Sequence, residues 1–310
     1  MSAPSPTGTK APGPARDKEP GALVDARIQR RLSFLPWAPR WLRQRNLQLW
    51  VGLAILAVIV LLAAAAPWLT PYSPETQTIT NKLQGPSAAH WLGTDHLGRD
   101  ELTRFLYGAR TDLAVTLVAV LIPFTLGSIL GAMCGYFGGW FDMVIMRLAD
   151  IVTAFPFLVL VIALVFALGQ GVTSIFVAIS IVSWVAYARI VRGETLVLRQ
   201  REFVDACVTA GFRAPRIIGR HILPNVISQA VVFAMTDIVL NINVIITLSW
   251  LGLGIVPPTV DWGVMLSDSE QFMLIGPYHL ILVPAIGTVV FSFALSLIGD
   301  GLAVKLRAKR

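Results

Sequence analysis

One polar stretch contains two histidines and an aspartate, which are residue types that bind zinc. They are His90, Asp95 and His96. The histidines are six residues apart with the aspartate between them, which matches no standard zinc spacing. We therefore expect no metal site in this stretch.

Signatures of covalent or hydrolytic catalysis are missing from the sequence. Cys134 lies in an apolar run and Cys207 among polar residues, and they form no CxxC pair. No HExxH, GxSxG or paired catalytic carboxylates occur in or beside an apolar segment, and there is no GxxxxGKS/T phosphate loop. The chain is therefore not expected to be an enzyme, and any ATP chemistry must come from a partner.

Three polar residues, Asp237, Asn241 and Asn243, stand inside a long apolar segment. A carboxylate at the centre of a bilayer costs about 2.5–3.5 kcal/mol on insertion scales, so such groups usually face a bundle interior or a water-filled path. Two interpretations stay open. These residues line a candidate translocation path, or Asp237 pairs with a polar group of a neighbouring helix.

The composition shows what kind of structure must position these residues. The 310-residue chain is 55% hydrophobic and 14% charged, with a mean hydropathy of +0.69, which is too apolar for a soluble domain of this size. The net charge of +7 could suggest nucleic acid, but the basic residues flank apolar segments, so nucleic-acid binding is not expected. We predict an all-α polytopic membrane protein that contacts the lipid bilayer.

Six apolar segments are suited to transmembrane helices, which need about 20 residues to cross a bilayer. We expect spans at about 49–66, 113–135, 143–168, 172–190, 226–254 and 278–298. In the second span, Gly127, Gly131 and Gly135 put small residues on one helix face, where another backbone can approach closely. In the third span, Pro156 should kink the helix.

The segments outside the spans divide the chain. Residues 1–24 are expected to be a disordered arm, and residues 25–48 a basic juxtamembrane segment with Trp and Phe. The six-helix domain covers 49–310, with polar loops at 69–112 and 191–225. With a cytoplasmic amino terminus, all but four of the 25 Lys and Arg residues lie inside. The positive-inside rule therefore places both termini and the second loop in the cytoplasm, and the first loop outside.

The loop at 191–225 contains a segment suited to a short helix. Residues 202–210 would place Phe203, Ala206, Cys207 and Ala210 on one apolar side. With the arginines around it, such a helix would make a compact knob that docks in a groove on another protein. The alternative is an ordinary cytoplasmic loop whose arginines only enforce topology.

Three residues set the bends of this loop. Gly211 supplies the freedom for a sharp turn or a close backbone contact. Pro215 can open a second helix at its first turn, and Pro224 marks the start of the fifth span. Docking of the knob could then transmit motion to the spans at its two ends.

The loop resembles the cytoplasmic loop of binding-protein-dependent ABC import permeases. That family has Glu-Ala-Ala, three residues, Gly, nine residues and Ile-x-Leu-Pro. The corresponding residues of this sequence are Asp205-Ala206-Cys207, Gly211 and His221-Ile222-Leu223-Pro224. The spacing is the same, with Asp for Glu, Cys for the second Ala and His for Ile.

Further segments are similar to the dipeptide, oligopeptide and nickel permeases of the second-subunit type. They are HWLGTDHLGRD at 90–100, FLYGART at 105–111, GYFGGW at 135–140, RLADIVTAFP at 147–156, LSWLGLGIVPPTVDWGVML at 248–266 and GDGL at 299–302. The resemblance runs from about residue 49 to 302. It implies six transmembrane helices in the type I ABC importer permease fold, and a location in the bacterial inner membrane.

The resemblance also implies partners and site residues. The partners would be a homologous permease subunit, two ABC ATPase subunits that bind ATP and Mg, and an extracytoplasmic substrate-binding protein, so this chain would hold no cofactor itself. The residues that would couple it to the ATPases are Glu202, Phe203, Asp205, Ala206, Cys207, Gly211, Pro215 and Pro224.

The implied substrates are dipeptides or short oligopeptides, with nickel, glutathione or another peptide-like ligand as the alternative. A secondary transporter that works alone is a further alternative. It is disfavoured because that class often has several intramembrane charges, whereas Asp237 is the only deeply placed carboxylate.

Overall fold

The structure, a computed structural model, describes residues 47–272, 274 and 276–307. The expected arm at 1–24 and nearly all of the basic segment at 25–48 lie outside the described residues. The described part is helical, with turns and one isolated β-bridge between Thr94 and Asp100. The all-α class is therefore confirmed.

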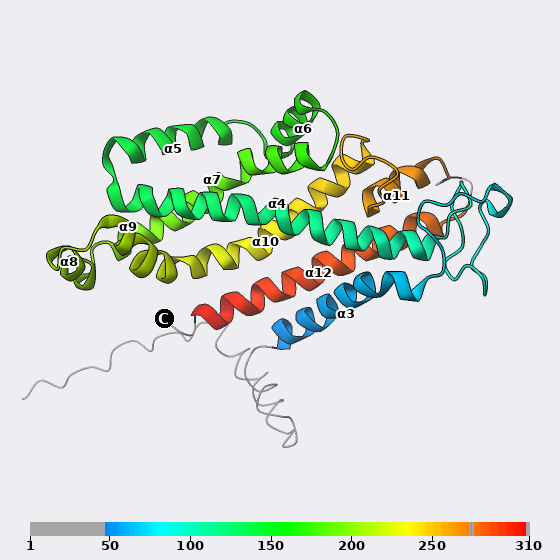
Figure 1. Cartoon of the computed structure of the whole chain (residues 1–310), viewed down its shortest axis with the longest axis horizontal. Helices are drawn as coiled ribbons and strands as arrows, with labels where there is room; N and C mark the ends of the chain where they lie inside the picture. The colour runs from blue at the N-terminus through cyan, green and yellow to red at the C-terminus, as the bar shows by residue number, and fades with distance from the viewer. Residues whose placement is uncertain (1–46, 273, 275, 308–310) are drawn as a thin grey trace, which may run out of the picture. The chain divides into compact units, whose positions relative to one another are not determined.

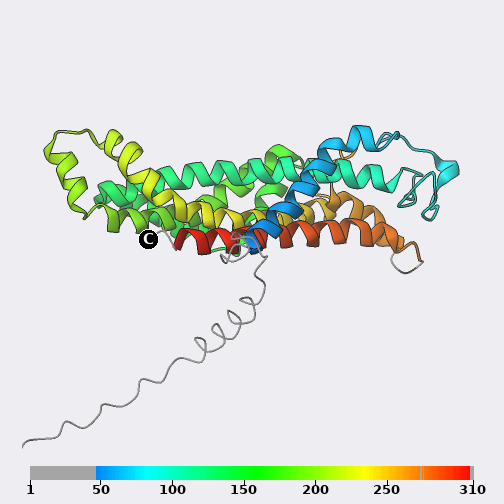
Figure 2. The same cartoon turned by 90° about the horizontal axis from the view of Figure 1, so that it is seen from below.

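The longest helices run alongside one another (Figures 1 and 2). They are α3 (Leu47–Leu69), α4 (Glu101–Phe137), α7 (Val172–Leu198), α10 (Leu223–Trp250) and α12 (His279–Arg307). The shorter helices are α5 (Gly139–Thr153), α6 (Phe157–Leu168), α8 (Glu202–Thr209), α9 (Ala214–Ile217) and α11 (Trp262–Ser269), with single turns η1 (Ile79–Asn81), η2 (Ile218–Ile222) and η3 (Glu270–Phe272). Among the described residues, five helices are long and apolar enough to cross a membrane, and α5 with α6 would make a sixth span.

Several helices extend beyond the predicted apolar spans. α4 begins at Glu101 rather than near residue 113, because Asp100 caps it: the Asp100 carboxylate accepts a hydrogen bond from the Thr103 backbone N–H at 2.8 Å. α7 continues to Leu198, and the stretch from Ala214 to Trp250 is helical without a break. The two polar loops are therefore shorter than the sequence suggested.

The third span is two helices at 90° to each other rather than one kinked helix. Pro156 lies between α5 and α6 with φ −58° and ψ 132°, an extended conformation. Proline also disfavours the helical conformation of the residue before it and offers no N–H to continue the helix. Pro156 therefore breaks the third span into two helices, whereas a single kinked helix was expected.

The three glycines of α4 lie against α7, as their spacing predicts. A Cβ at Gly127, Gly131 or Gly135 would come within 3.0 Å of the α7 backbone or of a Thr195 side-chain carbon, a separation that real Cβ atoms almost never show. α4 and α7 accordingly make the most extensive helix–helix contact of the described chain. Lipid tails are as apolar as leucine, so close packing of this kind holds membrane helices together.

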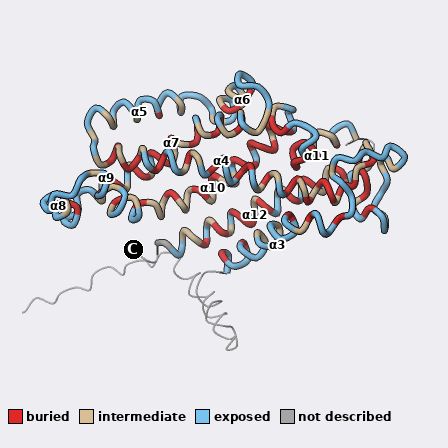
Figure 3. Tube along the Cα trace, in the orientation of Figure 1, coloured by how far each residue is buried: buried red, intermediate tan, exposed pale blue. Residues whose placement is uncertain are grey.

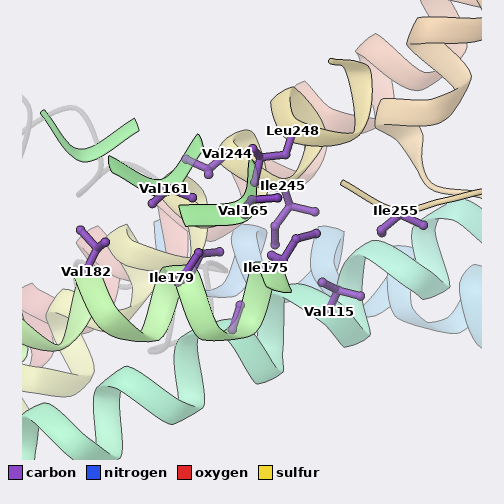
Figure 4. Close-up of a cluster of buried hydrophobic side chains, with 12 residues drawn as sticks. Val115, Val161, Val165, Ile175, Ile179, Val182, Val244, Ile245, Leu248 and Ile255 are labelled. Carbon is purple, nitrogen blue, oxygen red and sulfur yellow. The ribbon is translucent and has the colours of Figure 1, made fainter. Parts of the chain in front are cut away.

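One of the buried core clusters lies between α4, α6, α7 and α10. Buried positions concentrate along α4, α7 and α10, whereas α5 has Ala149 as its buried residue (Figure 3). Figure 4 shows the cluster at the centre of this packing. Its buried members are Val115, Ala119, Val161, Val165, Ile175, Ala178, Ile179, Val182, Val244, Ile245, Leu248 and Ile255.

Candidate functional site

The segment from Arg199 to Arg213, here called the α8 knob, protrudes beyond the ends of α7 and α10 (Figure 1). Arg201 is extended, with φ −85° and ψ 141°, so α8 starts at Glu202. Glu202 and Asp205 lie in its first turn, where negative charge is favoured by the helix dipole. This arrangement explains why so short a helix forms in a polar segment.

Gly211 ends α8 in a left-handed turn with φ +77°. The Phe212 N–H donates to the Cys207 carbonyl at 3.1 Å, and the Gly211 N–H donates to the Val208 carbonyl at 2.9 Å. These two bonds form a Schellman motif, which favours glycine at the left-handed position. A Cβ at Gly211 would have nothing within 4 Å, so this position faces open space.

The buried side of α8 differs from the predicted apolar side. Val204 is 2% exposed and Cys207 is half-buried against the same core cluster. Phe203 is 41% exposed, and Ala206 and Ala210 are exposed as well. Residues 203, 206 and 210 share one helix face and 204 and 207 share another. The four residues predicted to share one apolar side therefore lie on two faces of α8. Cys207 faces the bundle, and the other three point away from it.

The knob is anchored to both helices that flank it. Val204 belongs to a buried cluster that also contains Tyr187 of α7, Ile217 of α9 and Val226 of α10. On the return side, the Arg216 guanidinium lies 4.5 Å from the centre of the Phe212 ring. The knob is therefore packed against the bundle through Val204 and against α9 through Phe212.

The two prolines of this region both lie inside one helical stretch. Pro215 is in the first turn of α9, as expected. Pro224 lies in the first turn of α10, as expected for the start of the fifth span, and α10 follows the π-helical turn η2 without a break. A proline has no N–H to donate and its ring conflicts with the preceding turn, and a widened turn is a common accommodation at functional positions. The Asn225 side-chain amide donates to the His221 carbonyl at 2.6 Å.

Asp237 pairs with a neighbouring helix, which was one of the two interpretations. It is 4% exposed, and its Oδ2 accepts a hydrogen bond from the Tyr187 hydroxyl of α7 at 2.8 Å. The Asn241 amide donates to the Asp237 backbone carbonyl at 2.9 Å. Asn243 is exposed and bonds its own helix at the Val239 carbonyl, so the three residues do not share one face.

A cluster of charges at the opposite end of the bundle from α8 was not predicted. Arg104 is buried and its guanidinium bonds the carboxylates of Asp95 and Asp268, the latter at 2.8 Å. Arg99 bonds the same two carboxylates, at 2.6 Å and 2.8 Å. Burial alone would raise the pKa of Asp95, but the Arg104 and Arg99 guanidinium groups and two backbone N–H groups hold it below its usual value.

The same cluster contains the one group of side chains among the described residues that could hold a metal ion. Ligand atoms of Asp95, His96 and Asp268 lie within 4.8 Å of one another. Both carboxylates already accept hydrogen bonds from Arg99 and Arg104, which balance their charge. A metal cation would have to displace these ion pairs, which argues against a metal site here. The absence of a metal site remains a prediction.

A buried polar junction connects α4 to α11. The Trp262 backbone N–H donates to Asp112 Oδ2 at 3.0 Å, and the Trp262 indole N–H donates to the Phe105 carbonyl at 3.1 Å. Asp261 caps α11 by accepting from the Val264 N–H at 2.9 Å. Burial raises the pKa of Asp261, although its hydrogen bonds oppose the shift. The segments 105–111 and 248–266, quoted above for their family resemblance, meet at this junction.

Comparison with known proteins agrees with this architecture. The family model "Binding-protein-dependent transport system inner membrane component" matches residues 127–309, and the model "N-terminal TM domain of oligopeptide transport permease C" matches residues 44–86. The glutathione transport system permease protein GsiD of Pectobacterium atrosepticum is 40% identical over 278 residues, which cover 88% of this chain and 91% of the relative. The proteins of the same name from Escherichia coli O6:K15:H31 and Shigella boydii serotype 4 are 40% identical over 276 residues, with the same coverage.

Five of the described helices are long and apolar enough to cross a membrane, and the larger matching model is that of an inner membrane transport component, so the chain is an inner membrane transport permease. The chain belongs to the family of inner membrane components of binding-protein-dependent transport systems. It is accordingly a permease subunit of a bacterial ABC importer and works with ATPase and substrate-binding components.

Proposed function

We propose that this chain is one of two homologous permease subunits of an importer for short peptides or peptide-like ligands, and that the α8 knob couples it to the ATPases. The observation that carries the coupling proposal is the exposed face of α8. Phe203, Ala206 and Ala210 point away from the bundle while Val204 ties the knob to α7 and α10. An apolar face with small residues is suited to a groove in a partner.

The orientation supports the same proposal. The α8 knob carries Arg199, Arg201 and Arg213, and the positive-inside rule then places it in the cytoplasm, where ATP is available. Both termini would lie on that side, and the charge cluster around Arg104 would face outward, toward the substrate-binding protein. Two ATPase subunits would hold ATP and Mg, and their closure would move the knob between two positions, as rigid elements do in hinge-type transitions.

Peptide-like substrates are proposed from the relatives. The GsiD proteins are named for glutathione transport, and glutathione is a peptide-like molecule, so it and dipeptides are the first substrates to test. Nickel is the remaining alternative. The substrate-binding partner would make the first selection among them.

Reconstitution tests the transport proposal. The permease complex with its ATPases and binding protein, placed in liposomes, is expected to take up labelled glutathione or a dipeptide only when ATP and the binding protein are both present. Uptake by this chain alone without ATP would instead indicate a secondary transporter. Uptake of nickel alone would reject the peptide assignment.

Cross-linking tests the docking of α8. Ala206 is exposed, whereas Cys207 is half-buried, so a cysteine placed by Ala206→Cys in a Cys207→Ser background is the better probe. A bifunctional thiol reagent should join this cysteine to an ATPase subunit. A cysteine placed by Trp91→Cys in the same background, at an exposed position at the opposite end of the bundle, is the matched control and should not. Equal yields at both positions would favour a loop that only sets topology.

A further inference from the structure

A cavity of about 330 Å³ lies where α7 and α10 meet the bend between α5 and α6. Three aromatic side chains, Phe155, Phe157 and Phe233, contribute to its walls. The polar groups that line it include Asp237 of α10 and Arg189 of α7. Its size is at the lower end of the range for small-molecule sites, about 300–1,000 Å³.

The carboxylate in this cavity has no ion-pair partner among the described residues. Asp237 is buried, and its Oδ2 accepts a hydrogen bond from the Tyr187 hydroxyl. Ser183 also lines the cavity, and its buried hydroxyl has no hydrogen-bond partner within the described part of the chain. A buried carboxylate is costly unless it is paired with a cation. The cavity therefore offers a cation two polar groups, one of them charged.

The positive charge at the cavity is held by weak contacts. Arg189 Nη2 donates to the Asp150 carboxylate at 2.9 Å and to the Thr153 hydroxyl at 3.2 Å. The side chains of Arg189 and Asp150 are 45% and 56% exposed, and exposed ion pairs of this kind contribute only about 0–1 kcal/mol. Arg189 can therefore exchange Asp150 for another carboxylate at little cost.

We propose that this cavity is a transient binding site for zwitterionic, peptide-like substrates on their way through the permease. Asp237 and Ser183 receive the ammonium group, Arg189 receives a carboxylate, and the aromatic walls receive the side chain. A lone metal cation would not use the aromatic walls, and a long oligopeptide would exceed the volume. This inference rests on the proposed function, because it assigns a place along the path to the proposed substrate class.

Protection of a cysteine in the cavity tests the site directly. The probe is Ala186→Cys, at a half-buried lining position that makes no proposed polar contact, in a Cys207→Ser background of the assembled complex, labelled with a water-soluble maleimide. Glycyl-leucine should slow labelling, and N-acetylglycyl-leucine, which lacks the ammonium group, should not. Adding Asp237→Asn, which keeps an acceptor for Tyr187, should raise the peptide concentration for half-protection about tenfold or more, since hydrogen bonds to charged groups contribute about 1.5–3 kcal/mol.

Controls separate this site from the transport proposal. Asp237→Glu keeps the charge and should retain protection, as should Thr236→Ala at the neighbouring exposed position. Equal labelling with and without glycyl-leucine, or equal protection by the acetylated peptide, would overturn the proposal. The labelling assay needs neither ATP nor the binding protein, so its outcome is independent of the liposome transport assay. Failure to import peptides in liposomes would reject the proposed function but would leave the protection result to be judged by itself.

Discussion

Asp112 on α4 accepts a hydrogen bond from the backbone N–H of Trp262, 150 residues later in the chain, at 3.0 Å. A Cβ at Gly108, one turn before Asp112, would lie 3.2 Å from the Trp262 side chain, so the glycine lets the indole approach the helix. The indole N–H in turn bonds the Phe105 carbonyl. The segments 105–111 and 248–266 are thus the two sides of one packing junction.

Removing the acceptor at this junction should destabilise the permease. Asp112→Ala leaves the buried Trp262 N–H without a partner, which costs about 1–3 kcal/mol, whereas Asp112→Asn keeps an acceptor oxygen and should cost less. Thermal unfolding of the purified protein in detergent measures both. A melting temperature that falls equally for the two variants would show that the hydrogen bond is not what Asp112 contributes.

The contact between α4 and α7 should be sensitive to a single methyl group. Gly131→Ala would place a Cβ within 3.0 Å of the Ala188 backbone, and such overpacking costs about 1–3 kcal/mol. Gly193→Ala, also in α7, is the matched control, because a Cβ at Gly193 has no neighbouring atom within 4 Å. It should stabilise by about 0.5–1 kcal/mol through helix propensity. Chemical unfolding in mixed detergent compares the two, and equal stability would contradict the close approach.

The charge cluster predicts a response to acid. The pKa of Asp95 is lowered in the folded protein, so the stability that this carboxylate contributes is present above its ordinary pKa near 4 and is lost as the pH falls through the lower native value. Arg104→Met removes a buried partner and should raise the native pKa of Asp95. Local opening around residues 90–104 should then begin at a higher pH, as followed by hydrogen exchange between pH 3 and 7.

The same substitution should also lower stability at neutral pH. Breaking a buried ion pair by removing one partner costs about 3–5 kcal/mol, and the low end is expected here because Arg99 remains bonded to Asp95. Arg147→Met is the control, since Arg147 and Asp150 form an exposed pair worth about 0–1 kcal/mol. Equal losses for the two variants would show that burial of Arg104 does not matter.

The sequence predicted those features that depend on local spacing. Three glycines four residues apart indicated the close contact of α4, and Gly211 indicated the bend after α8, which the structure shows as a left-handed turn. Both follow from the steric freedom of glycine at a position set by helix geometry. The six apolar segments likewise correspond to helices of the bundle, with the third split at Pro156.

Features that depend on distant partners were not predictable in this way. Arg104 and Asp268 are 164 residues apart, so only the folded chain brings them together. The start of α4 was placed too late because its first turns are polar. Two of these polar residues find distant partners: Arg104 bonds Asp268, and Asp112 bonds the Trp262 N–H. On α8, both candidate faces contain apolar residues, and only packing against α7 and α10 decides that Val204 is the buried one.

The proposed role of the α8 knob is to transmit ATPase movement, and substitutions at Gly211 separate this role from folding. Gly211→Ala and Gly211→Trp both strain the left-handed turn, by about 1–2 kcal/mol, but only tryptophan adds bulk to the open space in front of the knob. Both variants should insert and assemble in similar amounts, because a Cβ at this position has nothing within 4 Å.

The test compares the two variants in the reconstituted complex. It measures peptide uptake and substrate-stimulated ATP hydrolysis. Coupling through the α8 knob predicts that Gly211→Ala keeps most of both activities while Gly211→Trp loses them at least tenfold. Equal transport and equal stimulated hydrolysis in the two variants would contradict it.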